Sequence, residues 1–149
     1  MDDLAHLLLG YILFRLMRLA GMKAGKLELA AILAGSILPD LLWAAGALSY
    51  NDAHTATWYI VAMVPFLIFA RTRIAASGFA MSSFLHILVD SVMHARTTVL
   101  FAPLSDFSIT GTFNYWEVWL ATPAYWLAIL ALLALSFYLQ KKKERRITF

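Results

Sequence analysis

One hydrophobic stretch of the chain contains three polar side chains at spacings of four residues: His86, Asp90 and His94. Positions i, i+4 and i+8 lie close to one face of an α-helix, so the three heads point in roughly the same direction. The stretch is apolar enough to span a bilayer, where a charged group at the centre costs ~2.5–3.5 kcal/mol. Imidazole and carboxylate groups bind divalent metals and transfer protons. The spacing therefore predicts a metal or proton site inside a helical bundle.

Three further ionisable residues lie in or beside apolar segments: His6, Asp40 and His54. The chain has no cysteine, which excludes disulfides and thiolate ligands. Histidine and carboxylate ligands make Zn²⁺ the first candidate, with Mn²⁺ and Fe²⁺ as alternatives. An ion with an open coordination position would lower the pKa of bound water towards ~7. The same ligands without an open position would form a structural clamp.

The composition is that of a membrane protein. Of the 149 residues, 62% are hydrophobic and 14% are charged, which is unlike an average soluble domain. We therefore expect one integral membrane domain over residues 1–149, with a basic cytoplasmic tail at 140–149. The net charge of +3 does not indicate nucleic-acid binding, because most basic residues stand at the ends of apolar segments, where they orient helices.

Five apolar segments predict an all-α, polytopic bundle of about five transmembrane helices. The segments run roughly over residues 4–20, 27–48, 53–70, 74–95 and 118–139. The one long connection, at about 96–117, would lie over the polar residues. Loops in such a place are often lids or substrate contacts.

The distribution of Lys and Arg predicts the orientation of these helices. With the first connection in the cytoplasm, all but one of the 12 basic residues fall on the inner side, and the exception is Arg96. Five spans then place the N-terminus outside and the C-terminus in the cytoplasm. In this arrangement the four histidines, Asp40 and Asp90 all fall in the outer half of the bilayer. We expect them to converge on a site that opens to the outer face.

Five short sequence patterns follow one another through the first 110 residues. They are His-Leu-Leu-Leu-Gly at 6–10, Gly-Ser-Ile-Leu-Pro-Asp at 35–40, His-Thr at 54–55, Leu-His-Ile-Leu-Val-Asp at 85–90 and Pro-Leu-Ser at 103–105. In order and spacing they resemble the LexA-binding, inner-membrane-associated metal-dependent hydrolase family of bacteria and archaea. The resemblance implies a hydrolase of the prokaryotic inner membrane. It also implies metal ligation by His6, Asp40, His54, His86 and Asp90.

The chain departs from the family pattern at two places. The family often has a second Asp two residues after the Pro-Asp pair, where this chain has Leu42. It often has two histidines around the start of the third segment, where this chain has only His54. Three interpretations stay open: fewer metals, His94 as a substitute ligand, or loss of catalysis.

Taken together, the residues favour a metal-dependent membrane hydrolase with an outward-facing site. Asp40 and Asp90 are the predicted catalytic residues, and the predicted metal ligands are His6, Asp40, His54, His86, Asp90 and His94. Membrane lipid is the expected partner, and the expected substrate is amphiphilic, such as a lipid phosphoester. Two non-catalytic alternatives stay open. One is a subunit of an ion or proton pathway, and the other is an assembly protein whose bundle is stapled by a metal.

Overall fold

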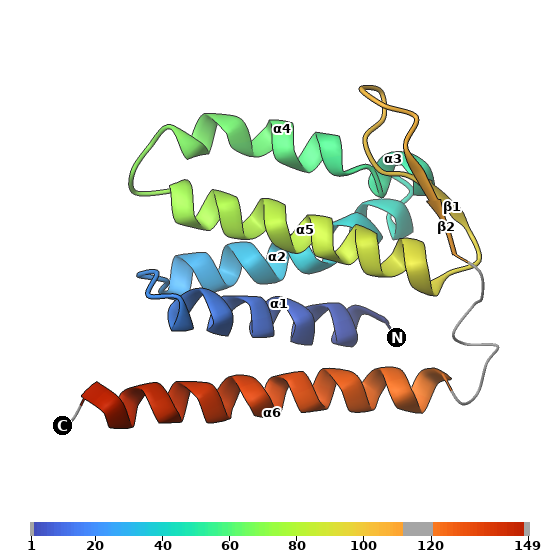
Figure 1. Ribbon diagram of the computed structural model, residues 1–149. Coiled ribbons are helices and arrows are strands. Elements are labelled where there is room, and N and C mark those ends of the chain that lie inside the picture. The colour runs from blue at the N-terminus through green and yellow to red at the C-terminus, as the bar shows by residue number, and fades with distance from the viewer. Residues whose placement is uncertain (1, 112–120, 148–149) are drawn as a thin grey trace.

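The structure is a computed structural model that describes residues 2–111 and 121–147. It is mostly helical, and its helices are α1 (Asp2–Leu19), α2 (Lys26–Ala44), α3 (Tyr50–Ala53), α4 (Ala56–Leu67), α5 (Arg73–Met93) and α6 (Ala121–Ile147). Strands β1 (Thr97–Val99) and β2 (Ser108–Thr110) form a short antiparallel pair. The long helices lie side by side, and α1, α2, α4 and α5 alternate in direction, as Figure 1 shows. Helix α6 runs in the same direction as α1.

Among the described residues, three stretches are long and apolar enough to cross a membrane: Lys26–Ala44, Arg73–Met93 and Pro123–Lys143. Large hydrophobic side chains stay exposed on them, including Leu127 and Leu130 of α6. Aliphatic side chains at such positions would be costly in water but are the expected surface of a helix in lipid. The exposed apolar surface therefore agrees with the membrane class predicted from the composition.

The predicted all-α architecture is wrong in one detail, because the connection after α5 contains the β1–β2 hairpin. The hairpin is attached to the helices by two hydrogen bonds. Ala56 N donates to Leu100 O at 2.9 Å, and Thr55 Oγ1 donates to Val99 O at 3.3 Å. Residues 112–117 of the predicted loop lie outside the described residues.

Some predicted helix bounds also differ. The segment predicted at 27–48 ends at Ala44, and Gly46 follows with a φ of 68°, a conformation that does not continue a helix. The segment predicted at 53–70 corresponds to α4, which is shorter at both ends, and its first residue, Ala53, ends α3. The expected tail at 140–149 is helical as far as Ile147, because its Gln, Lys, Glu and Arg residues all favour helix. The predicted start of the last segment, at 118, lies outside the described residues.

Small residues bring α2 close to α5. A Cβ atom added at Gly35 would overlap Phe79 O and Ser82 Oγ, and one added at Gly78 would lie 2.7 Å from Ile32 Cγ1. Close helix approach through small residues is typical of packing in membranes. It places Asp40, near the end of α2, beside the last turns of α5.

The close approach at Gly35 yields a prediction about stability. Gly35→Ala is expected to destabilise the protein by about 1–3 kcal/mol, because the added methyl group pushes α2 away from α5. Thermal unfolding in detergent, followed by circular dichroism, measures the change. Gly25→Ala is the control, since a Cβ atom there would meet only Glu28 Oε2, at 3.6 Å. Equal unfolding temperatures for the two variants would contradict this account of the contact.

Candidate metal centre

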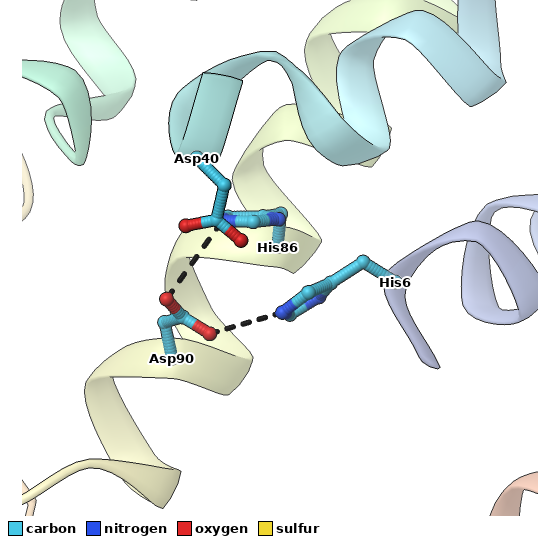
Figure 2. Close-up of side chains that lie close together, drawn as sticks. All are labelled: His6, Asp40, His86 and Asp90. Carbon is cyan, nitrogen blue, oxygen red and sulfur yellow. Dashed lines mark hydrogen bonds and ion pairs between the residues drawn. The ribbon is translucent and has the colours of Figure 1, made fainter. Parts of the chain in front are cut away.

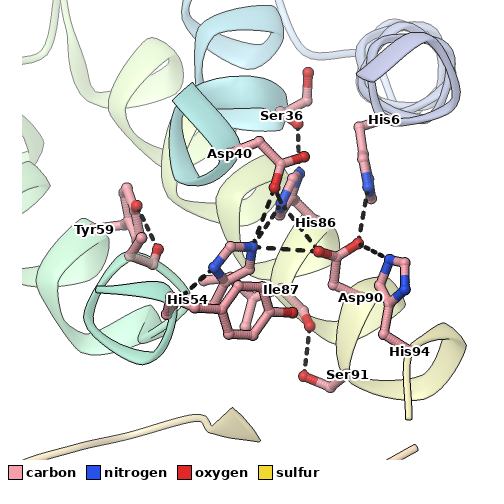
Figure 3. Close-up of polar contacts among 12 residues, drawn as sticks. His6, Ser36, Asp40, His54, Tyr59, His86, Ile87, Asp90, Ser91 and His94 are labelled. Atoms are coloured by element: carbon pink, nitrogen blue, oxygen red, sulfur yellow. Dashed lines mark hydrogen bonds and ion pairs between the residues drawn. The ribbon is translucent and has the colours of Figure 1, made fainter. Parts of the chain in front are cut away.

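The structure brings all six predicted site residues to one end of the bundle. His6 lies near the start of α1 and Asp40 near the end of α2, as Figure 2 shows. His54 follows α3 directly, and His94 follows α5. Because α1 runs towards the other end while α2 and α5 run towards this one, residues far apart in the chain meet here (Figure 3).

Four ligand atoms from four residues form the centre of this cluster. His54 Nε2 lies 3.3 Å from both Asp40 Oδ1 and Asp90 Oδ2, and 3.4 Å from His86 Nε2. His86 Nε2 lies 3.6 Å from Asp40 Oδ1 and 3.8 Å from Asp90 Oδ2. We call Asp40, His54, His86 and Asp90 the central four. The separations between each histidine nitrogen and the other ligand atoms of the central four fall between 3.3 and 3.8 Å.

Backbone carbonyls fix the tautomers of the two central histidines. His86 Nδ1 lies 2.8 Å from Ser36 O, and His54 Nδ1 lies 2.9 Å from Tyr50 O. A carbonyl oxygen only accepts, so both Nδ1 atoms carry hydrogen and, in neutral rings, both Nε2 atoms present lone pairs to the cluster. Metal-binding histidines are typically oriented by this kind of bond from the other ring nitrogen.

The separations within the central four fit a shared cation better than direct hydrogen bonds. Charge-assisted hydrogen bonds between nitrogen and oxygen are about 2.7–2.9 Å long, shorter than any separation here. Ligands about 2.0–2.1 Å from a tetrahedral Zn²⁺ lie about 3.3–3.4 Å from one another. Two carboxylates and two imidazoles face one another here inside the protein, and a divalent ion would balance the two carboxylate charges. The donor set and its spacing therefore fit a divalent ion.

The second oxygen of Asp90 faces the remaining two histidines. His6 Nε2 lies 3.0 Å from Asp90 Oδ1, and His94 Nε2 lies 3.7 Å from the same oxygen. Ligand atoms of His6, Asp40, His86 and Asp90 all lie within 4.8 Å of one another, so His6 is also within reach of a shared ion. Asp90 thus connects the central four with the pair formed by His6 and His94.

The side chains of the cluster differ in their exposure. The side chains of His54 and His86 are 0% exposed, whereas Asp40 is 18% and His94 is 20% exposed. A small molecule approaching the cluster would therefore meet Asp40 and His94 first. A largely buried site keeps electrostatic interactions strong, because little water screens them.

Two residues beside the cluster were not predicted as site residues. The ring of Tyr50 stacks on His54 with centroids 4.0 Å apart, and Arg96 lies 4.8 Å from the centroid of Tyr50. Burial, together with the nearby charge of Asp90, raises the pKa of Tyr50 to about 12, so its hydroxyl is protonated at neutral pH. That Arg96 is the one basic residue predicted on the outer side was visible in the sequence. The stacking was not.

The chain matches no known protein-family model, and no match to it was found among curated proteins or solved structures. The buried group of histidines and aspartates is therefore the main guide to function. It is a group that could hold a metal ion.

Proposed function

We propose that the protein is a metal-dependent hydrolase of the prokaryotic inner membrane, with an active site that faces outward. It would span the membrane five times, with the N-terminus outside and the C-terminus in the cytoplasm. The resemblance to the LexA-binding hydrolase family supports this proposal, as does the concentration of histidines and aspartates at one end of the bundle. Zn²⁺ is the proposed ion, with Mn²⁺ or Fe²⁺ as alternatives.

The observation on which the proposal rests is the spacing of the central four. Two carboxylates and two imidazoles supply the charge and donors that a divalent ion needs. A bound ion would act as a Lewis acid and lower the pKa of coordinated water. The ligands would be Asp40, His54, His86 and Asp90.

His6 is suited to accept a proton beside this centre. Its Nε2 atom lies 3.0 Å from Asp90 Oδ1, and a carboxylate only accepts, so Nε2 carries the hydrogen. The Nδ1 atom then has a free lone pair, and it is buried without a hydrogen-bond partner among the described residues. An imidazole held in this way by a carboxylate is the usual form of a histidine general base.

The position of Arg96 supports the proposal that the substrate is anionic. It lies at the same end of the bundle as the cluster, over the rings of Tyr50 and Trp43. A guanidinium group fixed on aromatic rings presents its N–H groups to a phosphate. Apolar helix surfaces lie around the site, so we propose a lipid-like phosphoester as the substrate.

Activity assays test the proposal directly. The purified protein would be incubated with phospholipids and with isoprenyl phosphates, with and without a chelator. We expect chelator-sensitive release of phosphate or of a phosphorylated headgroup. Absence of turnover on both substrate classes by the metal-loaded protein would contradict the hydrolase proposal.

Arg96 provides a further prediction within these assays. Arg96→Gln is expected to raise KM about tenfold, because hydrogen bonds to a charged group contribute ~1.5–3 kcal/mol. The value of kcat should change little if Arg96 only binds the substrate. Lys23→Gln, at the opposite end of the bundle, is the control. A loss of kcat with unchanged KM would place Arg96 in the chemistry instead.

The geometry also favours a second candidate, a structural metal staple. Structural zinc sites have four protein ligands, whereas catalytic sites keep a position open for water. The central four alone would fill a tetrahedral shell. If the protein is such a staple, removing the metal lowers the unfolding temperature while no substrate is turned over.

A further inference from the structure

A buried arginine lies at the end of the bundle opposite to the metal centre. Arg15 of α1 is 7% exposed. Its Nε atom donates to Ser136 Oγ of α6 at 2.9 Å, and its Cζ atom lies 3.4 Å from the ring centroid of Phe137. Helix α6 therefore covers Arg15 and holds its guanidinium plane in place.

Among the described side chains, no carboxylate balances the charge of Arg15. Of the side chains that the structure describes, no carboxylate forms an ion pair with it, and its remaining contacts are long. Nη2 lies 3.4 Å from Ser136 O, and Nη1 lies 3.5 Å from Tyr11 Oη. The carboxylate of Glu28, at the same end, accepts from Gly25 N at 2.7 Å. A buried cation without a counter-charge is costly, so an external anion is expected to supply the missing charge.

A groove connects Arg15 with the exterior. It has a volume of about 430 Å³ and is lined by Arg15, Phe137, Tyr138, Gln140 and Lys141. Lys141 is therefore a second cation in the groove, and Phe137 and Tyr138 make its other walls largely aromatic. Arg15 lies four residues before the end of α1, about 6 Å along the helix axis. This depth suits the phosphate of a lipid whose chains lie along α6.

We propose that this groove binds the phosphate of an anionic phospholipid in the cytoplasmic leaflet. Basic pockets between membrane helices are suited to such headgroups. The guanidinium would bind the phosphate through its unused N–H groups, with Lys141 as the second contact. The site is separate from the metal centre, and the proposal does not depend on hydrolase activity.

Native mass spectrometry of the detergent-purified protein tests this site. The protein would be titrated with phosphatidylglycerol and with phosphatidylcholine of identical acyl chains. We expect phosphatidylglycerol to bind about tenfold more tightly, and Arg15→Gln to remove that preference. Lys141→Gln should weaken binding by a smaller factor. The neighbouring Lys142→Gln is the control, because Lys142 does not line the groove.

Several results would overturn the proposal. These are equal affinity for the two lipids, wild-type affinity in Arg15→Gln, or displacement of phosphatidylglycerol by millimolar inorganic phosphate, which would assign the site to the free ion. If Arg15→Gln does not fold, Lys141→Gln measured against Lys142→Gln decides the question. His86→Ala should keep the lipid preference, because the metal centre lies at the other end of the bundle.

Discussion

Asp90→Asn is expected to abolish metal binding, with a loss of affinity of roughly 100-fold or more. Even residues that only orient metal ligands change affinity by about 10–100-fold, and Asp90 is proposed as a ligand itself. Its two oxygens contact both parts of the cluster, Oδ2 at 3.3 Å from His54 Nε2 and Oδ1 at 3.0 Å from His6 Nε2. The amide removes the negative charge while keeping the size of the side chain. Metal content of the detergent-purified variant, measured by inductively coupled plasma mass spectrometry, gives the result.

The control for this experiment is Asp106→Asn, which changes an exposed aspartate in the connection between β1 and β2. It should keep the metal content of the wild type. Circular dichroism would show whether each variant is folded. A folded Asp90→Asn protein with undiminished metal content would contradict the proposed coordination. Because ligand binding stabilises the folded state, added Zn²⁺ should also raise the unfolding temperature of the wild type and not that of Asp90→Asn.

The second prediction with a large effect is that the variants His86→Ala and His6→Ala differ in metal content and in kcat. His86→Ala should lose the metal, because His86 Nε2 belongs to the central four and its Nδ1 atom is held by Ser36 O. His6→Ala should keep most of the metal and lose about 10²–10⁴-fold in kcat, the usual contribution of a general base. Metal content and turnover on the same preparations separate the two effects.

This comparison also decides how far the family resemblance applies to His6. Equal loss of metal in His6→Ala and His86→Ala would make His6 a ligand, as the resemblance implies. Full activity in His6→Ala would exclude it from the chemistry. If the centre is a structural staple, His86→Ala lowers stability and neither variant has an activity to lose.

Much of the helical framework could be predicted from apolar segments and charge. Runs of apolar residues between basic ones predict membrane-length helices at 27–48 and 74–95, and α2 and α5 lie there. The hairpin was missed because its strands have three residues each, too few for a periodic signal. Their β-branched residues, as in Thr97–Val99, were the available indication.

The sequence predicted that the histidines and aspartates of the site would come together, but it did not predict which of them contact one another. Alternating helix direction was enough to bring Asp40 and Asp90 to the same end. The spacing of four predicted that His86, Asp90 and His94 point in roughly the same direction, and the two oxygens of Asp90 do face different histidines. The contact of His54 with Asp40 and Asp90 depends on packing between distant segments, which local patterns do not encode. The burial of Arg15 by α6 was missed for the same reason.

X-ray absorption spectroscopy of the zinc-loaded protein tests the central claim most directly, because it reports the number, type and distance of the ligands. The account predicts a first shell of nitrogen and oxygen atoms at about 2.0–2.1 Å, with the scattering signature of two imidazoles. His54→Ala and His86→Ala should each remove one imidazole. A shell of oxygen atoms without imidazole, or failure of the folded protein to retain zinc, would contradict it.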